Sequence, residues 1–250
     1  MLQSKKGKLL IVLTAVSLLI TSAFYAMTAR QVTTNEAIGM VNVWKDKNLD
    51  GGHWVHLVFS VTSHEENGVV LPSGQTIPLS YINDDWYFLN EAGLVEKGVF
   101  TMKDINGNIL QQSAFRNNVM VNFTFADRQE NIQPYPLNVD LGFEALLQEA
   151  QTKNLVIRKS DDKVKGKPSL AFSYVEKLQL PTQLSGKSVV VDSITIKGDF
   201  DKKTSDLLQL QTILNLEDGT EVVNETVLII SVDSSPIAND EILEVLEAVK

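Results

Sequence analysis

The chain of 250 residues contains no cysteine and only three histidines. Without cysteine, the protein cannot form disulfides, zinc–thiolate sites or iron–sulfur clusters, and it cannot carry a lipid on an acylated cysteine. Positive charge is also scarce, since 22 Lys and Arg stand against 31 Asp and Glu, for a net charge of −9. Nucleic-acid binding normally requires a basic surface, so this balance argues against a nucleic-acid partner.

Long hydrophobic runs are missing from the sequence except near its start. Lys5, Lys6 and Lys8 precede residues 9–29, which carry no charge. This order is typical of a signal peptide, with cleavage expected near Ala23 to Ala29. The run is also long enough to be a membrane anchor whose lysines stay cytoplasmic. Either alternative predicts that residues 1–30 engage the cytoplasmic membrane and that the rest of the chain is extracytoplasmic.

Catalytic motifs are absent as well. The sequence has no G-x-S-x-G elbow, no Walker motif and no G-x-G-x-x-G. Adjacent carboxylates are numerous. Glu65-Glu66, Asp84-Asp85 and Asp161-Asp162 are catalytic candidates, but each lies in a predicted turn or loop, where solvated charge is the ordinary outcome. We therefore predict a protein without enzymatic activity or cofactor. The alternative is a hydrolase that uses converging carboxylates or a Ser-His pair in a cleft.

The stretch "DKNLDGG" has part of the spacing of a calcium-binding loop. Asp46, Asn48 and Asp50 occupy the first, third and fifth positions, and Gly51 follows them. The position that should hold a bidentate glutamate is Leu57, at the start of a predicted strand. We predict an Asp/Asn/Gly turn here, and no metal site beyond a weak surface calcium site as the alternative.

Most of the remaining sequence is typical of β-strands, because Val, Ile, Thr and aromatic residues alternate with polar ones. The segments concerned are "GMVNVW", "HWVHLVFSV", "DWYFLN", "LVEKGVFTM", "VMVNFTF", "LVIRKS", "LAFSYVEKLQL", "SVVVDSITIKG", "LLQLQTILNL" and "EVVNETVLIISV". Asn106-Gly107 and Asp218-Gly219 predict tight hairpins. Two amphipathic helices are predicted in "VDLGFEALLQEAQ", capped by Asp140, and in "NDEILEVLEAVK", capped by Asn239.

The predicted strands and helices recur in one order, which indicates an internal duplication. "LVFS" at 57–60 matches "LAFS" at 170–173, Phe88 matches Phe200, and Gly107 matches Gly219, at a nearly constant offset. We predict a first β-rich repeat over 31–153 that ends in a helix. A charged loop or linker follows over 154–169, and a second β-rich repeat over 170–250 also ends in a helix.

These elements predict a mainly β fold of the α+β class. The favoured architecture is one large, curved antiparallel sheet, shaped like a half-barrel, with two covering helices that bury their apolar stripes against it. The alternative is a pair of tandem small β-domains. The passage "FDKKTSDLLQLQTILNLEDGTEV" resembles the strand-hairpin-strand units of lipoprotein carriers and mycobacterial lipid-binding lipoproteins. The resemblance covers residues 38–250 as an order of elements, although the Arg-Pro element and the acylated cysteine of that family are missing.

The resemblance implies non-covalent binding of a lipid or another apolar or amphipathic small molecule. The bulky residues at the repeat landmarks are core candidates, and some of them are ligand-binding candidates if they face a groove: Trp54, Phe59, Trp86, Phe88, Phe172 and Phe200. We therefore predict an exported, membrane-anchored, non-catalytic envelope protein that binds an apolar ligand. The alternative is a structural or adhesive module for cell-wall glycan or a protein partner, because "DDWYFLNEAGLVEKG" is similar to one cell-wall-binding repeat.

Overall fold

The fold is given by a computed structural model that describes residues 30–63, 69–70, 76–77, 80–117, 119–123, 129–132, 141–184 and 187–249. The predicted signal peptide or anchor lies outside the described residues, apart from Arg30, and so does the Glu65-Glu66 pair. Within these ranges, none of the helices has the length and apolar character needed to span a bilayer.

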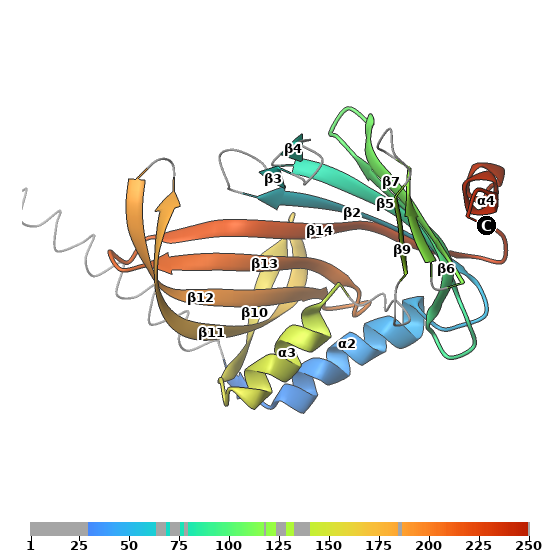
Figure 1. Ribbon diagram of the computed structural model, residues 1–250. Coiled ribbons are helices and arrows are strands. Elements are labelled where there is room, and N and C mark those ends of the chain that lie inside the picture. Colours follow the sequence, from blue (N-terminus) through green and yellow to red (C-terminus); the bar gives the residue numbers. More distant parts are fainter. Residues whose placement is uncertain are drawn as a thin grey trace, which may run out of the picture.

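Among the described residues, twelve antiparallel strands form one open sheet (Figure 1). In chain order they are β1 (Arg30–Val32), β2 (Trp54–Ser63), β5 (Ser80–Leu89), β6 (Val95–Lys103), β7 (Ile109–Arg116), β8 (Val119–Asn122), β9 (Gln129–Ile132), β10 (Ile157–Val164), β11 (Lys167–Leu184), β12 (Lys187–Asp201), β13 (Leu207–Leu216) and β14 (Glu221–Ser235). In space the order is β1-β10-β11-β12-β13-β14-β2-β5-β6-β7-β8-β9, and a short pair, β3 (Val69–Val70) and β4 (Thr76–Ile77), stands apart.

The single large sheet confirms the favoured architecture, and the alternative of two tandem domains is wrong. The two predicted repeats are joined within this sheet by β14, which pairs with β13 of the second repeat and, along most of its length, with β2 of the first. Much of the charged segment 154–169 is the strand β10 rather than a loop. Its charged residues alternate between the two faces of the sheet while its backbone pairs with β11, so a polar sequence still forms a regular strand.

Three helices are described: α2 (Thr34–Asn48), α3 (Phe143–Thr152) and α4 (Asp240–Glu247). Figure 1 shows α2 and α3 side by side against one face of the sheet and α4 apart from them near β6. Lys45, late in α2, forms an ion pair of 2.9 Å with Glu144, early in α3, as expected for antiparallel neighbours. We call the face that α2 and α3 cover the helix face, and the opposite face, which carries α4, the outer face.

The helix α2 was predicted wrongly as a strand over "GMVNVW". Its two valines favour a strand by propensity and its Gly39 disfavours a helix, but the burial of Ala37, Val41 and Trp44 at helical spacing decides the outcome. The missed sequence signal was the T-x-x-E pattern of Thr33 and Glu36, which is typical of a helix N-terminus. The Thr33 hydroxyl oxygen accepts a hydrogen bond of 3.2 Å from the Glu36 amide.

The two predicted helices are present, but only one of them covers the helix face. In α3, Phe143, Leu147 and Ala150 are buried against the sheet beside α2. The expected cap Asp140 lies outside the described residues, and Gly142 stands at the N-cap instead. Asn239 caps α4 as predicted, through a 2.9 Å hydrogen bond from the Ile242 amide. However, α4 packs on the outer face, so the second covering helix is α2.

Candidate binding site on the outer face

The six aromatic residues predicted to contact a ligand are divided between the two faces of the sheet. Phe59, Phe172 and Phe200 belong to the core on the helix face, whereas Trp54, Trp86 and Phe88 belong to a cluster on the outer face. This division follows from the alternation of side chains along a strand. The six side chains therefore do not share one groove, and only those on the same face could contact one ligand.

The phenylalanines under α3 fill the space between helix and sheet. Phe172 and Phe200 are fully buried, with ring centroids 6.0 Å apart in an edge-to-face arrangement. Phe143 of α3 approaches Phe200 from the helix side, at 6.2 Å between centroids. Gly198 admits the Phe143 ring, because a Cβ at that position would lie 2.4 Å from Phe143 Cε1. These residues act as core rather than as the wall of a ligand groove.

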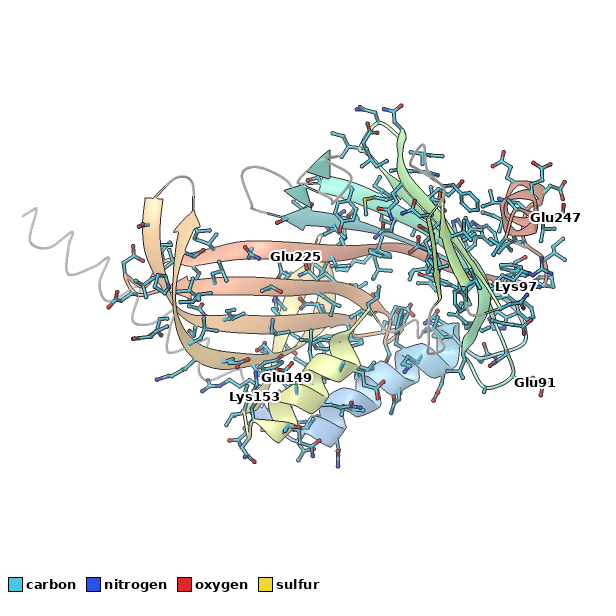
Figure 2. All side chains as sticks on the ribbon, in the orientation of Figure 1. Glu91, Lys97, Glu149, Lys153, Glu225 and Glu247 are labelled. Carbon is cyan, nitrogen blue, oxygen red and sulfur yellow. The ribbon has the colours of Figure 1, made fainter. Side chains whose placement is uncertain are left out.

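The aromatic cluster on the outer face is covered by α4. Ile242 and Leu246 of the helix pack in one cluster with Trp54, which is only 4% exposed. Trp54 and Phe88 contact edge to face at 5.5 Å, and Lys97 Nζ lies 4.7 Å from the centroid of the Phe88 ring. Figure 2 shows Lys97 near α4, at the same end of the molecule as Glu247. The rings are thus already occupied by contacts within the chain.

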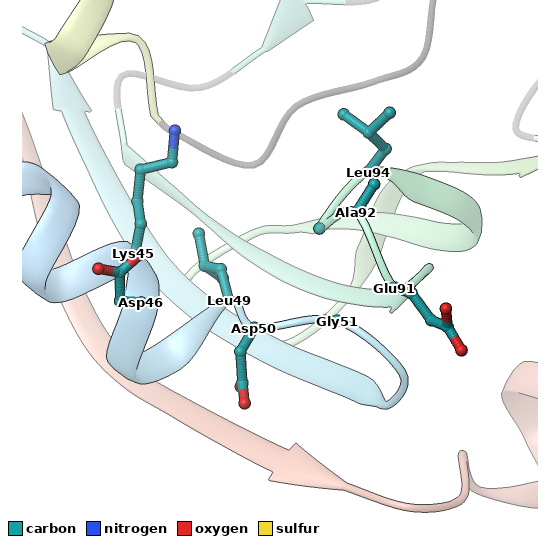
Figure 3. Close-up of a pocket in the computed structure, with 9 residues that line it drawn as sticks. Lys45, Asp46, Leu49, Asp50, Gly51, Glu91, Ala92 and Leu94 are labelled. Carbon is teal, nitrogen blue, oxygen red and sulfur yellow. The ribbon is translucent and has the colours of Figure 1, made fainter.

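The calcium-loop candidate does not have the geometry of a calcium-binding loop. Asp46 and Asn48 lie inside α2, where residues two apart point in different directions, and only Asp50 lies beyond the helix. A shallow polar pocket of about 430 Å³ is present where the end of α2 meets the β5–β6 turn, and Asp46, Asp50 and Glu91 line it. Figure 3 shows these three carboxylates pointing in different directions. In the part of the chain that the structure describes, no cluster of three or more metal-ligating side chains occurs.

Asp84 and Asp85 lie in β5 rather than in a turn, so the two carboxylates face opposite sides of the sheet. On the outer face, partial burial favours a higher pKa for Asp84, but Lys103 Nζ at 2.6 Å and His56 Nε2 at 2.7 Å outweigh it and lower the pKa. The other carboxylate, Asp85, is buried on the helix face, and burial raises its pKa to about 7.

The Asp85 carboxylate keeps two hydrogen-bond donors, the Tyr87 hydroxyl at 3.0 Å and the Thr101 amide at 3.1 Å, and both oppose the rise in its pKa. Paired catalytic carboxylates need a common space, and the sheet separates Asp84 from Asp85. Asp161 and Asp162 are likewise neighbours in a strand, β10. These two pairs therefore do not form a glycosidase site.

A larger depression, of about 1010 Å³, lies at the other half of the sheet. Its wall includes side chains of β10, β11, β12 and β13 that alternate with those of the helix-face core, so they project from the outer face. The wall is completed by the connection from α3 to β10, which contributes Leu155 and Val156. Val156 and Val175 are 48% and 46% exposed, so apolar surface is accessible in the depression.

The strand register places the lining of this depression in two parallel rows. Arg158 pairs with Ser173, which pairs with Lys197, so these three form a polar row across β10, β11 and β12. Val175 pairs with Thr195, which pairs with Ile213, and these form a mainly apolar row. The rows are adjacent, since Ser173 and Val175 are two residues apart on one face of β11. The depression is thus amphipathic across its width.

The two cations of the polar row have different surroundings. Burial favours a lower pKa for Lys197, but Asp162 and Asp199 outweigh it and raise the pKa above its ordinary value. Asp199 lies 3.2 Å from Lys197 Nζ and also accepts hydrogen bonds from Ser169 and Gln209. The charge of Lys197 is therefore compensated inside the protein. Arg158 is exposed and makes no hydrogen bond or ion pair with any described residue.

Sequence reasoning did not find this depression. It places Arg158 at a strand end and in a charged loop, and it treats Val175 and Ile213 as ordinary strand residues. The signal that brings them together is the register between β10, β11, β12 and β13, which a sequence without its pairing partners does not reveal.

No protein-family model and no curated protein matches the chain. Among solved structures, MucB in complex with MucA(peri) has a TM-score of 0.43 at 11% identity, over 82% of this chain and 58% of that chain. The chain thus spans less than two thirds of the length of that structure. An uncharacterised conserved protein from Thermus thermophilus has a TM-score of 0.42 at 9% identity, over 83% of this chain and 93% of that chain. A LolA superfamily protein from Nitrosomonas europaea has a TM-score of 0.28 at 9% identity, over 83% of this chain and 96% of that chain. Similarity at this level assigns neither a family nor an activity.

Proposed function

We propose that the chain is an exported, non-catalytic binding protein and that the outer depression holds an amphipathic small molecule. The observation that carries this proposal is the pairing of a polar row with an apolar row in a depression of about 1010 Å³. Small-molecule sites are usually concave, with a mostly apolar wall and a few polar groups that fix orientation. Exposed Val156 and Val175 supply apolar surface that a ligand would remove from water.

The space between the sheet and the helices is a less suitable place for a ligand. A ligand between sheet and helices would have to displace the packed rings of Phe143, Phe172 and Phe200. The outer depression needs no such rearrangement. Export and membrane anchoring remain part of the proposal, and they rest on the basic and apolar pattern of residues 1–30.

A glycan-recognition or adhesive function is supported less well. Aromatic platforms for sugars need exposed ring faces, but Trp54 is buried under α4. The Trp86 ring has one face stacked on His56, with centroids 4.3 Å apart. We therefore do not propose these aromatic residues as a surface for cell-wall glycan.

The proposal is tested by expressing the full chain for export and purifying it in amphipol. Native mass spectrometry and an organic extract then report any bound molecule. We expect an added mass that the extract identifies as an amphipathic lipid. In Val175→Asp, a carboxylate in the apolar row should abolish this added mass, whereas Ile109→Asp, a matched change at a 55% exposed position of β7, should retain it. A Val175→Asp protein that is folded and keeps the ligand would place the ligand elsewhere and overturn the proposal.

A further inference from the structure

The polar row of the outer depression contains one cation without a partner among the described residues. The guanidinium of Arg158 projects from β10, and no described residue accepts a hydrogen bond from it or forms an ion pair with it. Lys197, in the same row, has two carboxylate partners in Asp162 and Asp199. An incoming anion would therefore compete with internal ion pairs at Lys197 but with water alone at Arg158.

The hydroxyl groups next to Arg158 extend its capacity to bind an anion. Ser173 is its cross-strand partner, and Ser160 stands two residues further along the same face of β10; both line the depression. A guanidinium presents its donors in a planar fork that fits the oxygens of a phosphate or a carboxylate, and serine hydroxyls can donate to further oxygens. This end of the depression therefore favours an anionic group.

The apolar row indicates where the rest of the ligand, beyond its anionic group, would lie. Val175, Thr195 and Ile213 lie on β11, β12 and β13, so the row extends away from the strand of Arg158. From β10 to β13 there are three strand spacings, about 14 Å in all. At the far rim, the exposed carboxylate of Glu221 on β14 would repel an anion. An anionic head is thus favoured at β10 and an apolar tail across β11 to β13.

We infer that the outer depression selects amphipathic molecules with an acidic headgroup, and that Arg158 binds this headgroup while the row through Val175 and Ile213 holds the hydrocarbon. The inference rests on the proposed function and names the ligand class that the site prefers. The occupant is a lipid-borne phosphate or carboxylate rather than a free anion, because the apolar row contributes only to ligands with a hydrocarbon tail.

Isothermal titration calorimetry on the full chain in amphipol tests this assignment with three probes: decyl phosphate, decyl maltoside and inorganic phosphate. The first two share a hydrocarbon tail and differ in the charge of the headgroup. We expect decyl phosphate to bind more tightly than decyl maltoside and inorganic phosphate to bind weakly. Arg158→Gln should weaken decyl phosphate roughly 10- to 100-fold and leave decyl maltoside unchanged, because one charge-assisted contact is lost.

Arg116→Gln is the matched control, since Arg116 is an exposed arginine at the end of β7, outside the depression. It should leave all three affinities unchanged. Equal binding of both decyl probes, with no effect of Arg158→Gln, would overturn the headgroup assignment and leave the proposed function standing. Binding of inorganic phosphate as tightly as decyl phosphate would overturn the role of the tail. Failure of both decyl probes to bind would contradict the proposed function itself.

Discussion

The outer face of the sheet differs between its two halves. Over β2 and β5 to β8, the helix α4 covers the apolar surface, and Trp54, Val99 and Ala114 are buried beneath it. Over β10 to β13, the corresponding face is an open depression with exposed Val156 and Val175. Among the described residues, the sheet thus has one half of its outer face covered by its own chain and one half left accessible. This difference directs attention to the accessible half as the place for a ligand.

The largest effect on stability that we expect comes from Asp85, which lies on the helix face of β5, whereas its neighbour Asp84 lies on the outer face. Because the pKa of Asp85 rises from an ordinary 3.8 to about 7, the native state prefers the protonated acid. Between about pH 4 and pH 7 the folded protein binds the extra proton, so this residue lowers stability progressively as pH increases. A rise of this size corresponds to about 4 kcal/mol at neutral pH.

Replacement Asp85→Asn should therefore make the protein more stable than the wild type at pH 8, with the difference shrinking towards pH 4. Urea unfolding across this range measures it. Asp84→Asn is the control, and it should destabilise at neutral pH, because it removes the partner of Lys103 and His56. Parallel stability curves for wild type and Asp85→Asn would contradict the assignment of a raised pKa.

Truncation of a buried residue of α4 tests whether the helix seals the first half. Leu246 is 4% exposed and packs in the cluster with Trp54, so Leu246→Ala should lower the free energy of unfolding by about 3 kcal/mol. Leu243, on the same helix but 41% exposed, is the matched control and should lose less than about 1 kcal/mol on the same change. Equal losses for both variants would show that α4 does not depend on this packing.

Alanine substitutions at two glycines compare a packed position on the helix face with a solvent-exposed position of α2. Gly198→Ala should cost about 2 kcal/mol, because its Cβ would clash with the Phe143 ring and displace α3. Gly39→Ala, at an exposed position of α2 with open space around it, should instead stabilise by about 0.5–1 kcal/mol through helix propensity. Thermal unfolding of both variants measures the difference. A stabilising Gly198→Ala would contradict the seating of Phe143 on this glycine.

The weakest effect on stability belongs to the open half. Val175→Ser alters an exposed side chain, so the free energy of unfolding should change by less than about 1 kcal/mol. Binding of decyl phosphate should nevertheless weaken, because apolar contact area is lost from the row. Chemical unfolding and calorimetry together separate the two effects. A large loss of stability would show that Val175 is part of the core rather than of a binding surface.

Much of the sheet could be predicted from sequence, because alternation and turn chemistry are local. Gly107 and Gly219 have φ of 87° and 84° in the β6–β7 and β13–β14 turns, as the Asn-Gly and Asp-Gly signals predict. The helix α2 was missed because tertiary burial overrides strand propensity. The duplication stays a prediction. Leu57 and Leu170 both belong to the helix face, but Phe88 and Phe200 project from opposite faces, so the aligned landmarks are not all equivalent in space.

The candidate site could not be predicted because it depends on pairing between distant segments. Nothing local in "LVIRKS" or "LAFSYVEKLQL" reveals that Arg158 stands opposite Ser173, or that Val175 lies in one row with Ile213. Bulges at Leu178–Gln179 in β11 and at Asn224 in β14 shift the register locally, and a shift of one residue moves a side chain to the other face. Composition identified aromatic residues as candidates, whereas the register determined which face they occupy.

Photo-crosslinking can locate the ligand on one half of the sheet or the other. A photoreactive decyl phosphate is bound to the full chain in amphipol and activated, and the labelled peptides are mapped by mass spectrometry. We predict label on residues 154–160 and 173–175, with competition by unlabelled decyl phosphate. Label concentrated around Phe59 on the helix face, or around Trp54 and Phe88 under α4, would contradict the assignment of the binding site to the open half of the outer face.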